Sequence, residues 1–177
     1  MEPTTQDREF MQKAIDQSLA SIKRGGGPFG AVIVKDGKII AEVSNSVVPS
    51  HDPTAHAEVN AIRKACSVLG THILKGCTIY TSCEPCPMCL GAIYWARLDK
   101  IFMANTKTDA KNIDFDDSFI YDEIKKDDLK TRAIPTIHME GTNAIEAFNQ
   151  WKENSKKVHY WVKNIYDKIG QKIKRIY

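Results

Sequence analysis

The sequence predicts an α/β fold, a three-layer α/β/α domain around one mixed sheet. Helical and strand-like hydrophobic patterns alternate along the chain in the order α-β-β-α-β-α-β-β-α. Short buried strands separated by helices indicate parallel neighbours with helices on the faces of the sheet. A chain of 177 residues with 42% hydrophobic content can also bury one sizeable core. We therefore expect a single five-stranded mixed sheet covered by helices.

The first half of the chain begins with a helix and a hairpin. Apolar residues recur at helical spacing from about residue 6 to 24, before the stop "GGGP". Two β-branched runs in residues 29–44 flank Asp36-Gly37, a dipeptide that supplies the positive φ angles of a tight hairpin turn. A second amphipathic helix is expected over residues 54–70, with Asp52 or Thr54 as its cap.

The second half alternates strand and helix. A strand with a proline belongs at the edge of a sheet, and Pro135 therefore makes the fifth strand the weakest of the set. The expected elements are strands at 77–82 and 100–105 with a helix at 87–97 between them, then the fifth strand at 133–140 and a helix at 142–157.

Charge is unevenly distributed along the chain. Residues 156–177 hold seven Lys or Arg and one Asp, which leaves 18 basic against 21 acidic residues in the rest. We expect one domain over residues 1–157 and a basic extension over residues 158–177. Because the body is acidic, we expect neither a nucleic acid nor a membrane as a partner.

Cysteine usage and the N-terminus indicate the compartment. Three of the five cysteines are crowded into residues 83–89, which indicates metal binding rather than a disulfide framework. The N-terminus is polar, and no stretch approaches the length of a membrane span. We expect a cytoplasmic protein.

Two short motifs predict a metal site. Cys86 and Cys89 stand three apart at a helix start, where both sulfurs share one face and unpaired N–H groups favour thiolates. His56 offers an imidazole and Glu58 a carboxylate in "HAE". H-x-E followed by P-C-x-x-C is typical of zinc deaminases of nucleosides and bases.

The number of cysteine ligands decides between two kinds of site. If Cys83 joined His56, Cys86 and Cys89, four protein ligands would make a closed structural zinc site. That arrangement would leave Glu58 without a use, and Cys83 closes a strand rather than sharing the helical face. We favour the open site, in which the metal activates water and Glu58 moves protons, and we interpret Cys83 as a packing residue.

Residues 28 to about 160 resemble bacterial guanine deaminases of the cytidine-deaminase-like superfamily, as the stretches "HDPTAHAEVNAIRKAC", "TSCEPCPMCLGAIYWAR" and "FDDSFIY" indicate. The resemblance implies one Zn²⁺ per subunit and the hydrolysis of guanine to xanthine and ammonia. Glu58 would be catalytic. The resemblance also implies that Phe29 stacks on the base, that Asn45 bonds its edge and that Asp117 accepts from its N–H groups.

The same resemblance implies a homodimer that exchanges C-terminal segments, so that a tyrosine completes the partner's pocket. "FNQWKENSKKVHY" places Tyr160 at that position. Because the chain continues beyond Tyr160 and ends on Tyr177, Tyr177 is a second candidate. We expect the basic extension over residues 158–177 to pack in this dimer.

The sequence is also compatible with other functions. Guanosine or cytosine deamination would differ only in pocket shape. A tRNA adenosine deaminase would use the same zinc constellation on a flipped base. From a different class comes a zinc-stabilised binding module without turnover, built on the closed four-ligand site.

Overall fold

The computed structural model describes residues 2–160. The chain divides into two compact units, of which the first ends at Asp128 and the second begins at Leu129. Among the described residues, no helix has both the length and the apolar character that crossing a membrane requires. The expected domain limits at residue 157 stay a prediction.

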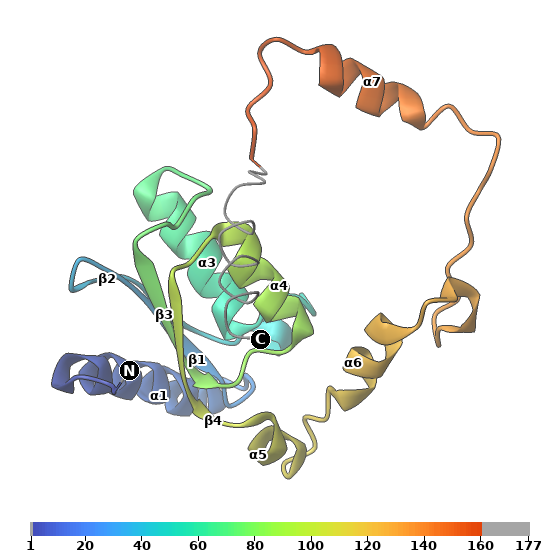
Figure 1. Ribbon diagram of the computed structural model, residues 1–177. Coiled ribbons are helices and arrows are strands. Elements are labelled where there is room, and N and C mark those ends of the chain that lie inside the picture. Colours follow the sequence, from blue (N-terminus) through green and yellow to red (C-terminus); the bar gives the residue numbers. More distant parts are fainter. Residues whose placement is uncertain (1, 161–177) are drawn as a thin grey trace, which may run out of the picture. The chain divides into compact units, whose positions relative to one another are not determined.

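The first unit is built on a four-stranded mixed sheet with the order β2-β1-β3-β4 (Figure 1). β1 pairs antiparallel with both β2 and β3, whereas β3 and β4 run parallel. The strands are β1 (Gly30–Lys35), β2 (Lys38–Ser44), β3 (Cys77–Cys83) and β4 (Lys100–Asn105).

The predicted fifth strand is wrong for this sheet. Residues 133–140 form no strand and lie in the second unit. Pro135 has no backbone N–H to donate to a strand ladder, and Ile134 and Ile137 are 85% and 74% exposed. The apolar alternation of this segment is therefore not satisfied by the sheet of the first unit.

The predicted hairpin between β1 and β2 is confirmed. Asp36 and Gly37 have φ angles of 49° and 72°, which are the left-handed values that a tight two-residue turn requires.

Helices cover both faces of the sheet, which confirms the three layers. α1 packs on one face through a cluster that includes Ala14, Val32 and Tyr80. α3 and α4 lie side by side on the other face (Figure 1), where their alanines pack against Ile33 and Ile79. The helices are α1 (Thr5–Lys23), α2 (Val47–Ser50), α3 (Ala57–Leu69), α4 (Pro87–Ala96), α5 (Lys107–Lys111) and α6 (Ser118–Lys125).

The second unit holds a short 3-10 helix, η1 (Leu129–Thr131), and α7 (Ile145–Glu153). α7 lies within the helix predicted over residues 142–157 and is shorter at both ends.

Candidate active site

Two helix starts carry the predicted metal donors. His56 is the residue that caps α3, and its extended backbone (φ −64°, ψ 155°) leaves its side chain outside the helical repeat. Cys86 has the same role and a similar conformation before Pro87 opens α4. The expectation that Asp52 or Thr54 caps α3 is therefore wrong. Residues two apart on a regular helix point about 200° away from each other, but His56 lies outside the helical repeat, so its side chain and that of Glu58 can approach the same site.

The three donors meet in one place. His56 Nδ1 lies 3.6 Å from Cys86 Sγ and 3.5 Å from Cys89 Sγ. In the described part of the chain, the three ligand atoms form a cluster in which every pair lies within 4.8 Å. One imidazole nitrogen and two sulfurs at these separations fit the donor preference and tetrahedral bond lengths of zinc. The residues present could therefore hold the ion.

Cys83 takes a different direction. It is buried, and its Sγ lies 3.6 Å from the carbonyl oxygen of Thr106. It is not a member of the three-donor cluster. This arrangement matches the interpretation of Cys83 as a packing residue and not the closed four-ligand site.

Local electrostatics separate these cysteines. Hydrogen bonds from Cys89 and then His56 hold the pKa of Cys86 well below its usual range. Burial instead raises the pKa of Cys83 to about 11. The hydrogen bond to Cys86 raises the pKa of His56. The thiolate form that zinc requires is thus favoured at Cys86 and opposed at Cys83. The pKa of Cys89 is raised as well, by its hydrogen bond with Cys86 and by burial, so its place in the cluster and not its pKa separates Cys89 from Cys83.

Glu58 lies beside the cluster in the first turn of α3 and is only 6% exposed. Its Oε2 lies 3.5 Å from Cys89 Sγ, and its Oε1 lies 3.2 Å from Thr81 Oγ1. Burial raises the pKa of Glu58. A raised pKa makes the carboxylate a stronger base, which suits a group that accepts and returns a proton.

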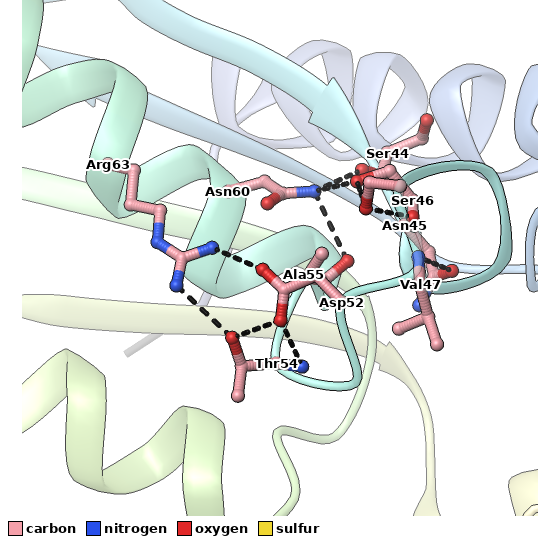
Figure 2. Close-up of polar contacts among 10 residues, drawn as sticks. Ser44, Asn45, Ser46, Val47, Asp52, Thr54, Ala55, Asn60 and Arg63 are labelled. Atoms are coloured by element: carbon pink, nitrogen blue, oxygen red, sulfur yellow. Dashed lines mark hydrogen bonds and ion pairs between the residues drawn. The ribbon is translucent and has the colours of Figure 1, made fainter.

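Asn60 holds together the two loops that frame the site (Figure 2). Its Nδ2 donates to the carbonyl oxygen of Ser44 at 3.0 Å, to Ser46 Oγ at 3.0 Å and to the carbonyl oxygen of Ala55 at 3.2 Å. These contacts join the chain that follows β2 to the residue just before His56.

An exposed ion pair closes the same loop from outside. Arg63 reaches back from α3 to Asp52 at 3.2 Å and to Thr54 Oγ1 at 3.1 Å. Asp52 Oδ1 in turn accepts from the backbone N–H of Thr54 at 2.8 Å (Figure 2). Asp52 thus shapes the turn before α3 instead of capping the helix.

The cluster opens into a pocket of about 420 Å³, which is large enough for a small heterocycle. Phe29 forms part of its wall, and Phe115 meets the Phe29 ring edge-on with centroids 5.0 Å apart. The pocket is lined by His56, Glu58, Cys83 and Cys86 near the cluster, by Gly27, Phe29, Asn45, Val47 and Val48, and by Glu84, Lys107, Ala110, Asp114, Phe115, Asp116, Asp117, Phe119 and Ile120.

Asn45 is buried and has a fixed orientation. Its Oδ1 accepts from the backbone N–H groups of Gly27 at 3.3 Å and Val47 at 3.2 Å. Because this oxygen is engaged by the loops, Nδ2 is the end of the amide that can donate to another molecule.

The two neighbouring acids before α6 differ in their surroundings. Asp116 pairs with Lys111 at 2.8 Å and accepts from the N–H of Ser118 at 3.0 Å. Asp117 makes no capping hydrogen bond with its side chain, lines the pocket and has its pKa raised, mainly by burial. Asp117 is therefore the acid that is available to a bound molecule.

The roles predicted for the two C-terminal tyrosines at this pocket stay predictions. Tyr160 lies in the second unit, where its ring meets Trp151 with centroids 6.1 Å apart. Tyr177 and most of the predicted basic extension lie outside the described residues.

Sequence patterns did not indicate Thr81, Asn60 or Phe115 as parts of the site. Thr81 and Asn60 occupy ordinary strand and helix positions, and their hydrogen bonds close to the metal donors become visible only in the folded structure. Phe115 precedes the two acids of "FDDSFIY", so this stretch was the one available signal.

Comparison with known proteins agrees with this geometry. The family model described as "Cytidine and deoxycytidylate deaminase zinc-binding region" matches residues 4–105. Guanine deaminase of Bacillus subtilis (strain 168) is 54% identical over 152 residues, 85% of this chain and 97% of that protein. The X-ray structure of guanine deaminase from Bacillus subtilis aligns with a TM-score of 0.85 at 53% identity, covering 87% of this chain and 98% of that chain.

Two further relatives differ in what they are reported to act on or bind. The tRNA-specific adenosine deaminase of Aquifex aeolicus (strain VF5) is 42% identical over 95 residues, 54% of this chain and 63% of that protein. A variant of NE0047 in complex with 8-azaguanine is 33% identical with a TM-score of 0.61, covering 64% of this chain and 65% of that one.

The shared motifs, the family match and the extent of the Bacillus similarity lead to one assignment. The chain belongs to the cytidine and deoxycytidylate deaminase family of zinc-dependent hydrolytic deaminases, and within it to the bacterial guanine deaminases.

Proposed function

We propose that this enzyme hydrolyses guanine at C2 to give xanthine and ammonia. The observation that carries the proposal is the three-donor cluster with a buried carboxyl group, which opens into a pocket lined by Phe29 and Asp117. The similarity to Bacillus subtilis guanine deaminase over 97% of that protein supports guanine as the substrate. The complex of NE0047 with 8-azaguanine, a guanine analogue, supports it further.

His56, Cys86 and Cys89 are the proposed ligands of one zinc ion per subunit. When bound, zinc supplies a Lewis acid that lowers the pKa of water. Glu58 takes the proton from the attacking water and delivers it to a ring nitrogen next to C2. It then takes the proton of the new C2 hydroxyl and passes it to the exocyclic amine, so that ammonia leaves and the C2 oxygen stays as a carbonyl.

Base recognition follows from the donors and acceptors around the pocket. Phe29 offers a ring face on which a flat purine stacks, while the perpendicular Phe115 ring limits its position. Asn45 donates from Nδ2 to an acceptor on the purine edge. Asp117 accepts from the N–H groups of guanine, whereas adenine has no N1–H to offer.

The charge of the pocket lining favours a neutral base over a nucleic acid. Glu84, Asp114, Asp116 and Asp117 lie in the lining together with Lys107. This arrangement opposes the approach of a phosphate backbone, which binds through clustered Lys and Arg. Guanine therefore remains favoured over a tRNA adenosine, despite the similarity to tRNA-specific adenosine deaminases.

We also propose a homodimer in which the C-terminal segments are exchanged and Tyr160 reaches the partner's pocket. The exposed apolar side chains of the second unit support this, because monomers rarely leave such side chains uncovered. They include Ile134, Ile137, Met139, Ile145 and Phe148. A cytoplasmic location suits the proposed thiolate ligands, since a reducing compartment keeps thiols free.

Two experiments test these proposals. Purified zinc-loaded enzyme should form xanthine and ammonia from guanine in equal amounts, and absence of either product would reject the reaction.

The exchange of C-terminal segments is tested by co-expressing Tyr160→Ala with Glu58→Gln, two variants that are each impaired alone. Each mixed dimer should have about half of wild-type activity, because one of its two pockets is complete; since random pairing makes half of the dimers mixed, the co-expressed population should recover roughly a quarter. Recovery of nothing would reject the exchange of Tyr160.

A further inference from the structure

Thr81 is a polar side chain buried beneath the reacting centre. β3 pairs with β1 through Ala31 opposite Thr81 and with β4 through Met103 opposite Thr81, which fixes its backbone on both sides. Cys77 and Ile79 belong to the core cluster under α3 and α4, and alternation along the strand points Thr81 to the same face. Its side chain therefore faces Glu58 from the floor of the site.

Burial makes the hydrogen bonds of this hydroxyl consequential. Thr81 is 2% exposed, and its Oγ1 lies 3.2 Å from Glu58 Oε1 and 3.0 Å from the carbonyl oxygen of Cys83. A threonine hydroxyl has one proton to donate and lone pairs that accept. Two oxygen atoms thus compete for a single proton, and rotation of the hydroxyl decides which of them receives it.

The Thr81 hydroxyl can form a hydrogen bond with Glu58 both when Glu58 is a carboxylate and when it is protonated. When Glu58 is a carboxylate, the hydroxyl donates to Oε1. When Oε1 carries a proton, Glu58 donates to Thr81 Oγ1, and the hydroxyl turns its own proton to the Cys83 carbonyl oxygen. The carbonyl is an acceptor only, so it can take the proton in the second arrangement.

We propose that Thr81 is a positioning residue for the catalytic glutamate. It holds Oε1 in place throughout the proton transfers and keeps Oε2 directed to the side of Cys89. The proposal rests on the proposed function, because it assigns Thr81 a part in the proton transfers of that reaction. Thr81 is not among the residues that line the pocket, so it acts on substrate only through Glu58.

The test compares Thr81→Val, which has nearly the same shape without the hydroxyl, with Thr81→Ser, which keeps the hydroxyl. Loss of a hydrogen bond to a charged group is worth about 10- to 100-fold. We expect kcat for guanine to fall by about 10-fold or more in Thr81→Val, with KM and zinc content unchanged, and to recover in Thr81→Ser. Thr78→Val on the same strand is the matched control, since its side chain points to the opposite face.

A double-mutant cycle separates positioning from a general loss of structure. In the Glu58→Gln background, Thr81→Val should cost little further activity, because the group it positions has already lost its function. Equal losses in both backgrounds, or full kcat in Thr81→Val, would overturn the role while leaving the reaction intact. If the wild-type enzyme formed no xanthine from guanine, the proposed function would fail first and the role of Thr81 with it.

Discussion

Replacing Glu58 by glutamine tests the division of labour between the buried carboxyl group and the metal donors. The amide has nearly the same shape, and its Oε1 can still accept from Thr81 at the observed 3.2 Å. It cannot carry a proton between water and the leaving amine. General acid–base catalysis contributes about 10²–10⁴-fold, and Glu58 serves both halves of the reaction. We therefore expect kcat to fall toward the upper limit, about 10⁴-fold, which is about 5.4 kcal/mol of activation free energy.

The assay is xanthine formation at saturating guanine, with zinc measured in the same preparation by atomic spectroscopy. Zinc should stay at the wild-type level, because His56, Cys86 and Cys89 are unchanged. Thermal stability should hold or rise, since burial opposes the charged form of Glu58, as its raised pKa shows. Glu42→Gln on the exposed side of β2 serves as the matched control. Activity within about tenfold of wild type would refute the assignment of Glu58.

Three further predictions follow from particular contacts. Cys83→Ser should keep zinc and most turnover, whereas Cys86→Ser should lose zinc on dialysis; equal zinc loss in both would favour the four-ligand site. Asn60→Asp replaces the Nδ2 donor by a carboxylate oxygen, which cannot donate to the three oxygen atoms that Asn60 binds. The unfolding free energy should therefore fall by on the order of 2 kcal/mol, and Asn60→Ser should lower it by less, as denaturant titration can measure. The pKa of Asp7 is lowered from 3.8 to about 2 by hydrogen bonds from Thr4 and Tyr80, so its contribution is full above pH 4 and disappears as pH falls toward 2. Asp7→Asn should thus flatten the melting-temperature profile in that window, and parallel profiles would contradict the assigned bonds.

Local sequence patterns were sufficient for most of the first unit. The hairpin at Asp36-Gly37, the four strands and the helices over the sheet follow from hydrophobic period and turn chemistry. Such patterns report which face of an element is buried, but not which element covers it; α1, for example, packs against Tyr80 of β3.

The metal donors could be predicted as a set, but their backbone geometry could not. Whether His56 lies inside α3 or caps it depends on one pair of dihedral angles, and a sequence pattern does not resolve a boundary to that accuracy. The loop before His56 is held by Asn60 and by the ion pair of Asp52 with Arg63. These contacts join residues 5 to 16 positions apart in the chain, beyond the reach of a local pattern.

The predicted fifth strand does not form in this sheet, and the reason again lies in contacts that a local pattern does not show. Residues 133–140 have an apolar alternation that suits an edge strand, but a strand needs a partner with a free edge in the right place. In the structure this segment belongs to the second unit and its apolar side chains are exposed. The proposed exchange between subunits would supply that partner, which a single sequence cannot specify.

Substrate choice tests the central proposal most directly. Ammonia release should be measured from the zinc-loaded full-length enzyme given guanine, guanosine, cytosine, cytidine and adenine separately. The geometry predicts turnover of guanine and none of adenine, because Asp117 accepts from N–H groups that adenine lacks. Preference for adenine or cytosine, or no release from guanine, would contradict the assignment of this pocket to guanine.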